Sequence, residues 1–369
     1  MRIAFDSQIF TLQIYGGVSR YITRLASELD EQQQDVRIFA PVYLNKHLNN
    51  IHPETLSGIH LSLKIRGTLP LLRYINFNFS KAKIAAWKPQ IMHETYYATR
   101  PISPTNVPCV VTLHDMIHEK MPHHFKANDR TSHTKMKALD RADHIICVSE
   151  NSRRDLLELT SVPYSKTSVV HLGFDSPESC HLTHERSPYK HPSRPYILYV
   201  GKREGYKNFK FLIESFSQST ILRKELDIVA FGSHPFTHQE IKLMGTLGLK
   251  LDQVQHHTGD DASLRSFYRH ASAFVYPSLY EGFGIPPLEA MANDCPVVSS
   301  RAGSMPEVLG EAAEFFDPTD YHQLSTAIEI VVFSASRRND LVRLGQERLK
   351  NYSWKRCAEE TLEVYRELL

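Results

Sequence analysis

The chain has 369 residues, of which 41% are apolar and 23% are charged, and its formal net charge is +2. This length exceeds what one hydrophobic core usually serves, so we expect two domains, and the composition is that of a folded globular protein. A net charge so close to zero, without a basic tail, gives no support to nucleic-acid binding.

The sequence also argues against export and against a structural metal. The five cysteines are scattered and form no Cys-x-x-Cys pair, so neither a disulfide framework nor a thiolate zinc site is expected. The first residues, MRIAFDSQIF, have a strand pattern and lack the basic region and long apolar run of a signal peptide. No run of about eighteen apolar residues, the length that spans a membrane, occurs. We therefore expect a cytoplasmic protein with reduced thiols.

The first half of the chain alternates short apolar runs with helical segments. RIAFDS predicts a buried strand, and the glycine pair Gly16 and Gly17 then precedes VSRYITRLASELD, which has helical spacing. The runs DVRIFAP, PQIMHETY, PCVVTLHD, ADHIICVSE and SVVHLGF continue the pattern. This alternation of strand and helix predicts a parallel α/β sheet.

The alternation stops in a polar, proline-rich stretch and then restarts with YILYVG. The stretch predicts a linker over 178–192 between a domain of residues 1–177 and a domain of residues 193–352. Two such units predict an α/β protein of two Rossmann-like domains, with parallel sheets facing across a ligand cleft. The tail 353–369 has helical spacing, and we expect it to pack back on the first domain.

The stretch YEGFGIPPLEAMA, residues 280–292, directly follows the predicted strand ASAFVYPS. In open parallel sheets, ligands bind outside the carboxyl ends of the strands. Gly284 allows a close approach of the backbone to a ligand, and Pro286 and Pro287 suit a helix that starts near Ile285. The N-terminus of such a helix favours an anion, for which a diphosphate is the natural candidate.

Two carboxylates, Glu281 and Glu289, lie on either side of this turn. From one turn into the helix, Glu289 can accept two hydrogen bonds from neighbouring hydroxyls such as those of a ribose. Glu281, on the loop, can reach a second polyol. The spacing therefore fits a nucleotide sugar, whereas the spacing alone would equally suit two surface glutamates beside an ordinary turn.

The segment EGFGIPPLEAMANDCPVVSS resembles the signature of the retaining glycosyltransferases of family 4, which have the GT-B fold, and the resemblance extends over nearly the whole chain. The chain is most similar to bacterial mannosyl- and rhamnosyl-type transferases that build O-antigen and other surface polysaccharides. The resemblance implies a hexosyltransferase whose second domain binds a GDP-, UDP- or dTDP-sugar, with GDP-mannose the first choice. It also implies a glycan or lipid-linked acceptor on the first domain, retention of the anomeric configuration, and no metal ion or other cofactor.

Within YVGKREGYKNF, the resemblance assigns the diphosphate to a basic pair, taken here as Arg203 and Lys207, with Lys202 as a competitor for the first position. Because departure of a nucleoside diphosphate develops negative charge, fixed cations have to stabilise it where no metal ion does so. A solvated basic loop is the simpler alternative.

The resemblance also assigns roles in the first domain. The backbone of Gly16 and Gly17 is expected near the donor phosphate and the acceptor, and His114, in VVTLHDMIHEKMP, is expected to contact the donor sugar. A tight turn and a structural histidine are the alternatives. The catalytic set is therefore His114, Glu281, Arg203 and Lys207, and the leaving phosphate itself is expected to take the acceptor proton.

Three questions stay open at this level. A nucleotide-sugar epimerase or hydrolase, or a non-catalytic partner subunit that binds a nucleotide sugar, would share the donor site. Residues 63–88 mix apolar and basic side chains, which fits either peripheral contact with the inner membrane or an ordinary solvated helix face. The histidines near His118 could form a zinc site only with a carboxylate or thiolate partner, and none is evident.

Overall fold

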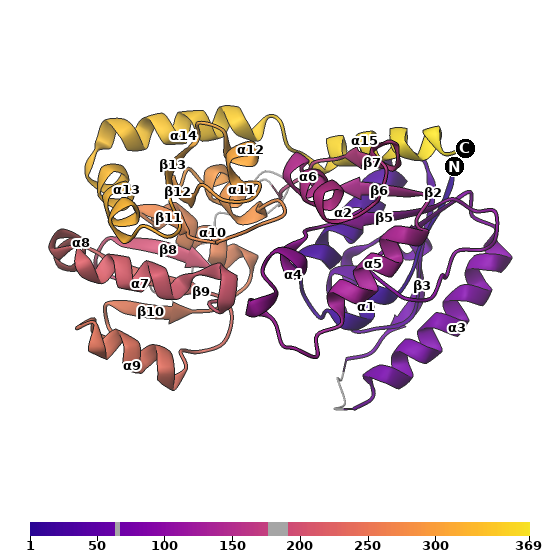
Figure 1. Ribbon diagram of the computed structural model, residues 1–369, viewed down its shortest axis with the longest axis horizontal. Helices are drawn as coiled ribbons and strands as arrows, with labels where there is room; N and C mark the ends of the chain where they lie inside the picture. The colour runs from indigo at the N-terminus through magenta and orange to yellow at the C-terminus, as the bar shows by residue number, and fades with distance from the viewer. Residues whose placement is uncertain (63–66, 176–190) are drawn as a thin grey trace. The chain divides into compact units, whose positions relative to one another are not determined.

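The computed structural model describes residues 1–62, 67–175 and 191–369 (Figure 1). The chain divides into two compact units: unit 1 contains Met1–Gly173 and Ser353–Leu369, and unit 2 contains Phe174–Tyr352. Most of the linker expected at 178–192 lies outside the described residues, as do residues 63–66 of the basic segment.

The sheet of unit 1 has seven parallel strands in the order β3-β2-β1-β4-β5-β6-β7. Its central strands are almost fully buried, as expected of a parallel sheet with helices on both faces. The strands are β1 Arg2–Phe5, β2 Asp35–Tyr43, β3 Leu56–His60, β4 Ile91–Glu94, β5 Cys109–Leu113, β6 His144–Cys147 and β7 Thr167–Val169. The α-helices are α1 Gln8–Leu12, α2 Gly17–Glu31, α3 Leu69–Trp87, α4 Ile117–Lys120, α5 Thr131–Arg141, α6 Glu150–Leu159 and α15 Trp354–Glu367.

The last helix, α15, belongs to unit 1 and packs beside α2 (Figure 1). The ring of Trp354 lies 6.4 Å from that of Tyr21 on α2. Farther along α15, the hydroxyl of Tyr365 hydrogen-bonds Nδ1 of His93 at 2.5 Å, and Nε2 of His93 hydrogen-bonds Thr112 at 2.8 Å. The C-terminal helix is therefore tied to the centre of the sheet through buried polar groups.

The sheet of unit 2 has six parallel strands in the order β10-β9-β8-β11-β12-β13. They are β8 Tyr196–Val200, β9 Asp227–Phe231, β10 Val254–His257, β11 Ala273–Tyr276, β12 Val297–Ser300 and β13 Ala313–Phe316. The α-helices are α7 Phe209–Gln218, α8 Thr220–Glu225, α9 His238–Thr246, α10 Asp261–His270, α11 Ile285–Ala292, α12 Met305–Leu309, α13 Tyr321–Phe333 and α14 Ala335–Leu349.

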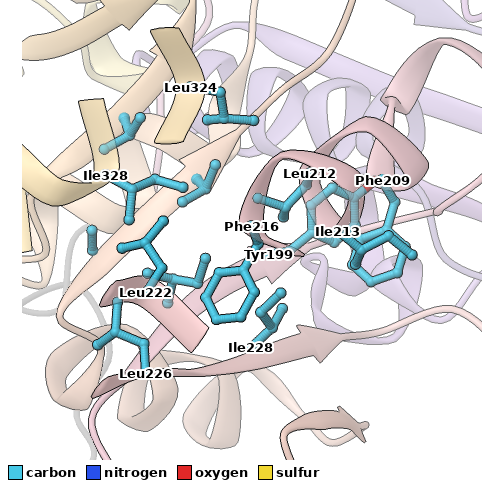
Figure 2. Packing of buried hydrophobic residues seen from close by; sticks show 14 of the residues in the cluster. Tyr199, Phe209, Leu212, Ile213, Phe216, Leu222, Leu226, Ile228, Leu324 and Ile328 are labelled. Atoms are coloured by element: carbon cyan, nitrogen blue, oxygen red, sulfur yellow. The ribbon is translucent and has the colours of Figure 1, made fainter. Parts of the chain in front are cut away.

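Helix α7 shows how the sequence builds the core of unit 2. Phe209, Leu212, Ile213 and Phe216 recur at helical spacing, and each is at most 1% exposed. Figure 2 shows them gathered with side chains from β8, β9, α8 and α13, among them Tyr199. Burying a side chain of this size stabilises the fold by roughly 1.5–3 kcal/mol.

In each sheet the strand order reverses once, between β1 and β4 in unit 1 and between β8 and β11 in unit 2. At such a switch point the two neighbouring strands are followed by connections that leave in opposite directions, which opens a crevice at their carboxyl ends. The prediction of an α/β protein with two Rossmann-like domains and parallel sheets is confirmed. The switch points are the places to look for bound ligands.

Candidate active site

Three loops that follow β8, β11 and β12 meet at the carboxyl edge of unit 2. The N–H of Leu279 donates to the carbonyl of Tyr206 at 2.8 Å, which joins the first two loops across the switch point. The hydroxyl of Ser304 reaches the carbonyls of Glu281 at 3.1 Å and Phe283 at 2.9 Å, which joins the second and third. The loops therefore form one hydrogen-bonded surface.

Two glycines allow this close packing. Gly303 has φ +56°, and a Cβ there would lie 2.7 Å from the carbonyl oxygen of Glu281. Gly284 has φ +96°, and a Cβ there would lie 2.3 Å from Cε of Met305. Both positions combine a left-handed backbone with a steric need for glycine. The requirement at Gly284 thus comes from packing within the protein.

The centre of this surface is an ion pair between Lys207 and Glu281, whose Nζ and Oε1 are 2.6 Å apart. The two side chains are 21% and 12% exposed, so both are partly shielded from water. Nζ of Lys207 also lies 5.2 Å and 5.6 Å from the ring centres of Tyr206 and Tyr276. Burial and the charge of Glu281 hold the pKa of Tyr276 well above its usual range, so its hydroxyl stays protonated.

Arg203, the other residue of the expected basic pair, is paired with an acidic residue. Its side chain is fully buried, with Nε 2.6 Å from Oε1 of Glu240, and it also donates to the carbonyl of His234 at 2.7 Å. The guanidinium lies 4.8 Å from the ring centre of Phe236. Arg203 therefore ties the loop after β8 to the start of α9. Lys202, one residue earlier in the loop after β8, is exposed.

Helix α11 begins at Ile285, directly after Gly284, with prolines in its first turn. Glu289 is half-buried one turn into the helix, and Asn293 donates to its backbone carbonyl at 2.9 Å. The helix start that the sequence predicted therefore lies on the loop that carries Glu281. At the carboxyl edge of unit 2, Lys202 and Lys207 follow β8, whereas Glu281, Gly284, Ile285 and Glu289 follow β11, and Lys207 and Glu281 are in direct contact.

The remaining predicted residues lie in unit 1. Gly16 and Gly17 are at the start of α2, where Oε1 of Gln13 accepts a hydrogen bond from the N–H of Ser19 at 3.3 Å. A Cβ at Gly16 would meet this glutamine side chain, whereas a Cβ at Gly17 would meet no atom within 4 Å. Gly17 is thus open to whatever approaches the N-terminus of α2.

His114 follows β5, and its backbone N–H donates to the hydroxyl of Tyr97 at 3.2 Å. Its ring packs edge-on against Tyr21, with 5.5 Å between ring centres. The pKa of His114 is lowered to about 4, mainly by burial; the charge of Asp115 opposes this shift, and that of Lys135 adds to it. The imidazole is therefore neutral at pH 7.

Sequence reasoning missed the aromatic and hydroxyl groups that support the ion pair. Tyr276 is the last residue of β11, and Ser304 precedes α12. The position of Tyr276 at the end of the strand ASAFVYPS was the available signal. Nothing local in residues 302–310, which contain Ser304, indicates that this serine holds the Glu281 loop.

Comparison with known proteins identifies the chain. The family model described as "Glycosyltransferase Family 4" matches residues 15–178, and the one described as "Glycosyl transferases group 1" matches residues 183–348. The chain belongs to the glycosyltransferases of the GT-B fold. The family predicted from the residues around Glu281 is confirmed.

Several relatives of this glycosyltransferase transfer mannose. It is 29% identical over 269 residues to "O-antigen chain mannosyltransferase B" of Escherichia coli, which covers 70% of each chain. It is 31% identical over 228 residues to "MMP alpha-(1->4)-mannosyltransferase" of Mycolicibacterium hassiacum, which covers 60% of this chain and 53% of that protein. The match to "Serotype-specific mannosyltransferase WbdA" of Escherichia coli is 27% identical and spans 30% of the relative's length.

Solved structures share the fold of this glycosyltransferase. A sucrose-phosphate synthase from Thermosynechococcus elongatus has a TM-score of 0.75 at 20% identity and covers 100% of this chain and 98% of its own. WaaG, "a glycosyltransferase involved in lipopolysaccharide biosynthesis", has a TM-score of 0.72 at 16% identity over 98% and 99% of the two chains. Among the described helices, none has both the length and the apolar character to cross a membrane.

Proposed function

We propose that this glycosyltransferase moves a hexose, mannose in the first instance, from a nucleoside diphosphate to a glycan acceptor, and that it retains the anomeric configuration. The observation that carries the proposal is the Lys207–Glu281 pair at the switch point of unit 2, with Lys207 on the loop after β8 and Glu281 on the loop that leads into α11. The mannosyltransferases among its relatives support the choice of sugar. Because these relatives are transferases, an epimerase or hydrolase is not favoured.

The donor diphosphate would lie at the start of α11, where backbone N–H groups and the helix dipole favour an anion. Lys207 and Lys202 supply the positive charge, in place of the buried Arg203. When the donor binds, Lys207 lies between the carboxylate of Glu281 and the phosphate. Charge that develops on the leaving phosphate is then stabilised by groups that already have the right position, which is the most effective kind of electrostatic catalysis.

The two glutamates take different parts of the donor. Glu281, held by the backbone contacts of Ser304, would accept hydrogen bonds from the sugar hydroxyls, and Glu289 would accept them from the ribose. His114 is neutral at pH 7 and so offers a hydrogen bond to the sugar rather than a proton. The acceptor proton therefore passes to the leaving phosphate.

A peripheral position at the cytoplasmic face of the inner membrane belongs to the same proposal. The described part of α3 exposes Leu71, Tyr74 and Phe79, which are 59%, 66% and 59% exposed. Lys81 and Lys83 on the same helix are exposed as well. Apolar and basic side chains together are what an anionic lipid surface attracts.

Protection against thermal unfolding by GDP-, UDP- and dTDP-sugars tests the donor assignment, since a ligand that binds only the folded chain raises its stability. GDP-mannose should protect the wild type. Glu289→Ala should abolish the protection, and Lys202→Met should weaken donor binding by roughly tenfold, the loss of about one charge-assisted hydrogen bond. If Glu289→Ala bound the donor normally, or if no nucleotide sugar protected the wild type, the proposed function would be wrong.

A further inference from the structure

A pocket of about 210 Å³ lies in unit 1, between α1, α3 and the loop after β4. Ser7 and Gln8 follow β1, and Ala98 to Ile102 follow β4, so the pocket opens at the switch point of this sheet. It occupies the position in unit 1 that the Lys207–Glu281 pair occupies in unit 2. None of the catalytic or binding residues predicted from the sequence lines it, although four lining residues belong to the segment 63–88.

Hydrogen bonds fix the floor of the pocket. Nδ2 of Asn76 donates to Thr11 at 2.8 Å and to the carbonyl of Val42 at 2.7 Å, while its Oδ1 accepts from the N–H of Val42 at 2.9 Å. Nε2 of Gln8 donates to Asp6, which is fully buried beneath the floor, at 2.6 Å. The polar floor is thus already satisfied and has a defined shape.

The charged side chains in the walls of the pocket are all positive among the described lining residues. Arg73 comes from α3 and Arg100 from the loop after β4, and none of the described lining residues is acidic. Both arginines are exposed, and neither guanidinium forms a hydrogen bond or an ion pair with a residue in the described ranges. Elsewhere in unit 1, by contrast, Arg141 is paired with Glu94 and Lys135 with Glu119. Two uncompensated guanidiniums around one pocket favour an anion with several acceptor oxygens.

The remaining walls are apolar. Tyr74 and Phe77 of α3 line the same pocket as Ile102 and Leu12. A ligand that satisfies both parts of the pocket has an anionic group with several acceptor oxygens, joined to a sugar ring or a hydrocarbon chain. A neutral oligosaccharide would use the aromatic wall and leave both guanidiniums unpaired.

We propose that this pocket binds the phosphate of a phosphate-ester acceptor, with Arg73 and Arg100 on the phosphate and Tyr74 and Phe77 on its organic part. That the bound phosphate ester is the acceptor rests on the proposed function, whereas its binding in the pocket does not. The phosphate can belong to a soluble sugar phosphate or to a lipid-linked glycan. Both share the chemistry that the pocket recognises.

Calorimetric titration of the full chain with mannose 6-phosphate and with mannose tests the proposal. The phosphate ester should bind and mannose should bind far more weakly. Arg73→Gln and Arg100→Gln should each weaken phosphate binding by roughly tenfold, as expected from losing a charge-assisted hydrogen bond. Lys137→Gln is the control: it removes an exposed charge from α5 of the same unit but does not line the pocket, so binding should be unchanged.

A second arm identifies the source of the phosphate. Vesicles of phosphatidylcholine with and without dodecyl phosphate replace the sugar phosphate, and the two arginine variants are compared again. Arginine-dependent binding of either probe supports the pocket and tells a soluble acceptor from a lipid-linked one.

Lys207→Met separates the pocket from the donor site. Phosphate binding that is lost in Lys207→Met and kept in the arginine variants would belong to the donor site and overturn the proposal. Equal binding of mannose and mannose 6-phosphate would overturn it as well. If the protein bound the phosphate ester but no nucleotide sugar protected it against thermal unfolding, the proposed pocket would be supported and the proposed function would be wrong.

Discussion

The two sheets have the same strand order around their switch points, yet their carboxyl edges are built differently. In unit 2, Lys207 and Glu281 remain partly exposed and face one another within loops that are bonded together. In unit 1, the polar residues at the ends of β1 and β4 are buried: Asp6, His93 and Glu94 are each at most 1% exposed. The carboxyl edge of unit 2 therefore presents charged side chains at the surface. At the carboxyl edge of unit 1, the charged side chains at the ends of β1 and β4 are buried.

The burial in unit 1 changes the charge states of these groups. Burial and the charge of Asp6 raise the pKa of Glu94 to about 7, although Arg141 opposes them, and burial lowers the pKa of His93 to about 3. The shared strand order therefore determines where a ligand can bind, but the residues at the strand ends determine which kind of ligand binds there. The pair in unit 2 presents both a cation and an anion, whereas the charged residues among the described lining of the pocket in unit 1 are the two arginines at its rim.

The largest expected effect is the loss of Lys207. Lys207→Met removes a fixed cation from the edge of unit 2, and we expect kcat to fall by about 100- to 1000-fold, the usual cost of one well-placed electrostatic group. Lys210→Met is the control, because Lys210 is exposed on α7 and pairs only with Glu214 among the described residues. Steady-state kinetics with GDP-mannose and a mannosyl acceptor measures both. Similar losses in the two variants would mean that the edge of unit 2 has no special role.

A smaller effect should separate the glycines of the two units. Gly303→Ala should lower the free energy of unfolding of unit 2 by about 1–3 kcal/mol, because the alanine would occupy a left-handed backbone and collide with the backbone of Glu281. Gly17→Ala in unit 1 meets no atom within 4 Å and should leave stability nearly unchanged. Both tryptophans, Trp87 and Trp354, lie in unit 1, so tryptophan fluorescence follows that unit and circular dichroism follows both. Equal destabilisation by the two changes would contradict the packing described here.

The sequence was sufficient to predict the sheets and the edge of unit 2, because strand periodicity, glycines and prolines act over short distances. It was not sufficient to show that Arg203 is buried against Glu240. Lys202 and Arg203 are both basic neighbours in the loop after β8, and the sequence does not show which of them is buried. Nor could it show that His93 pairs with Tyr365, which is 272 residues away. Such contacts depend on how distant elements pack, so local patterns do not contain them.

The smallest expected effect concerns the dependence of unit 1 on pH. The pKa of His93 is about 3 in the folded chain, compared with an ordinary value of 6.5. Between these values the unfolded chain binds a proton that the folded chain does not, so this histidine lowers the free energy of unfolding as the pH falls below about 6.5. Glu94 acts in the opposite direction between 4.5 and about 7, since its pKa is raised on folding.

His93→Gln should therefore reduce the loss of stability between pH 6.5 and pH 5, while its amide can keep a hydrogen bond to Tyr365 or Thr112. Chemical denaturation followed by tryptophan fluorescence measures this loss in unit 1 alone. Glu94→Gln should make the loss steeper than in the wild type, because it removes the opposing group. If both variants followed the wild-type curve, the buried groups at the edge of unit 1 would be equally protonated in the folded and unfolded chains, and the contrast between the two edges would be one of shape rather than charge.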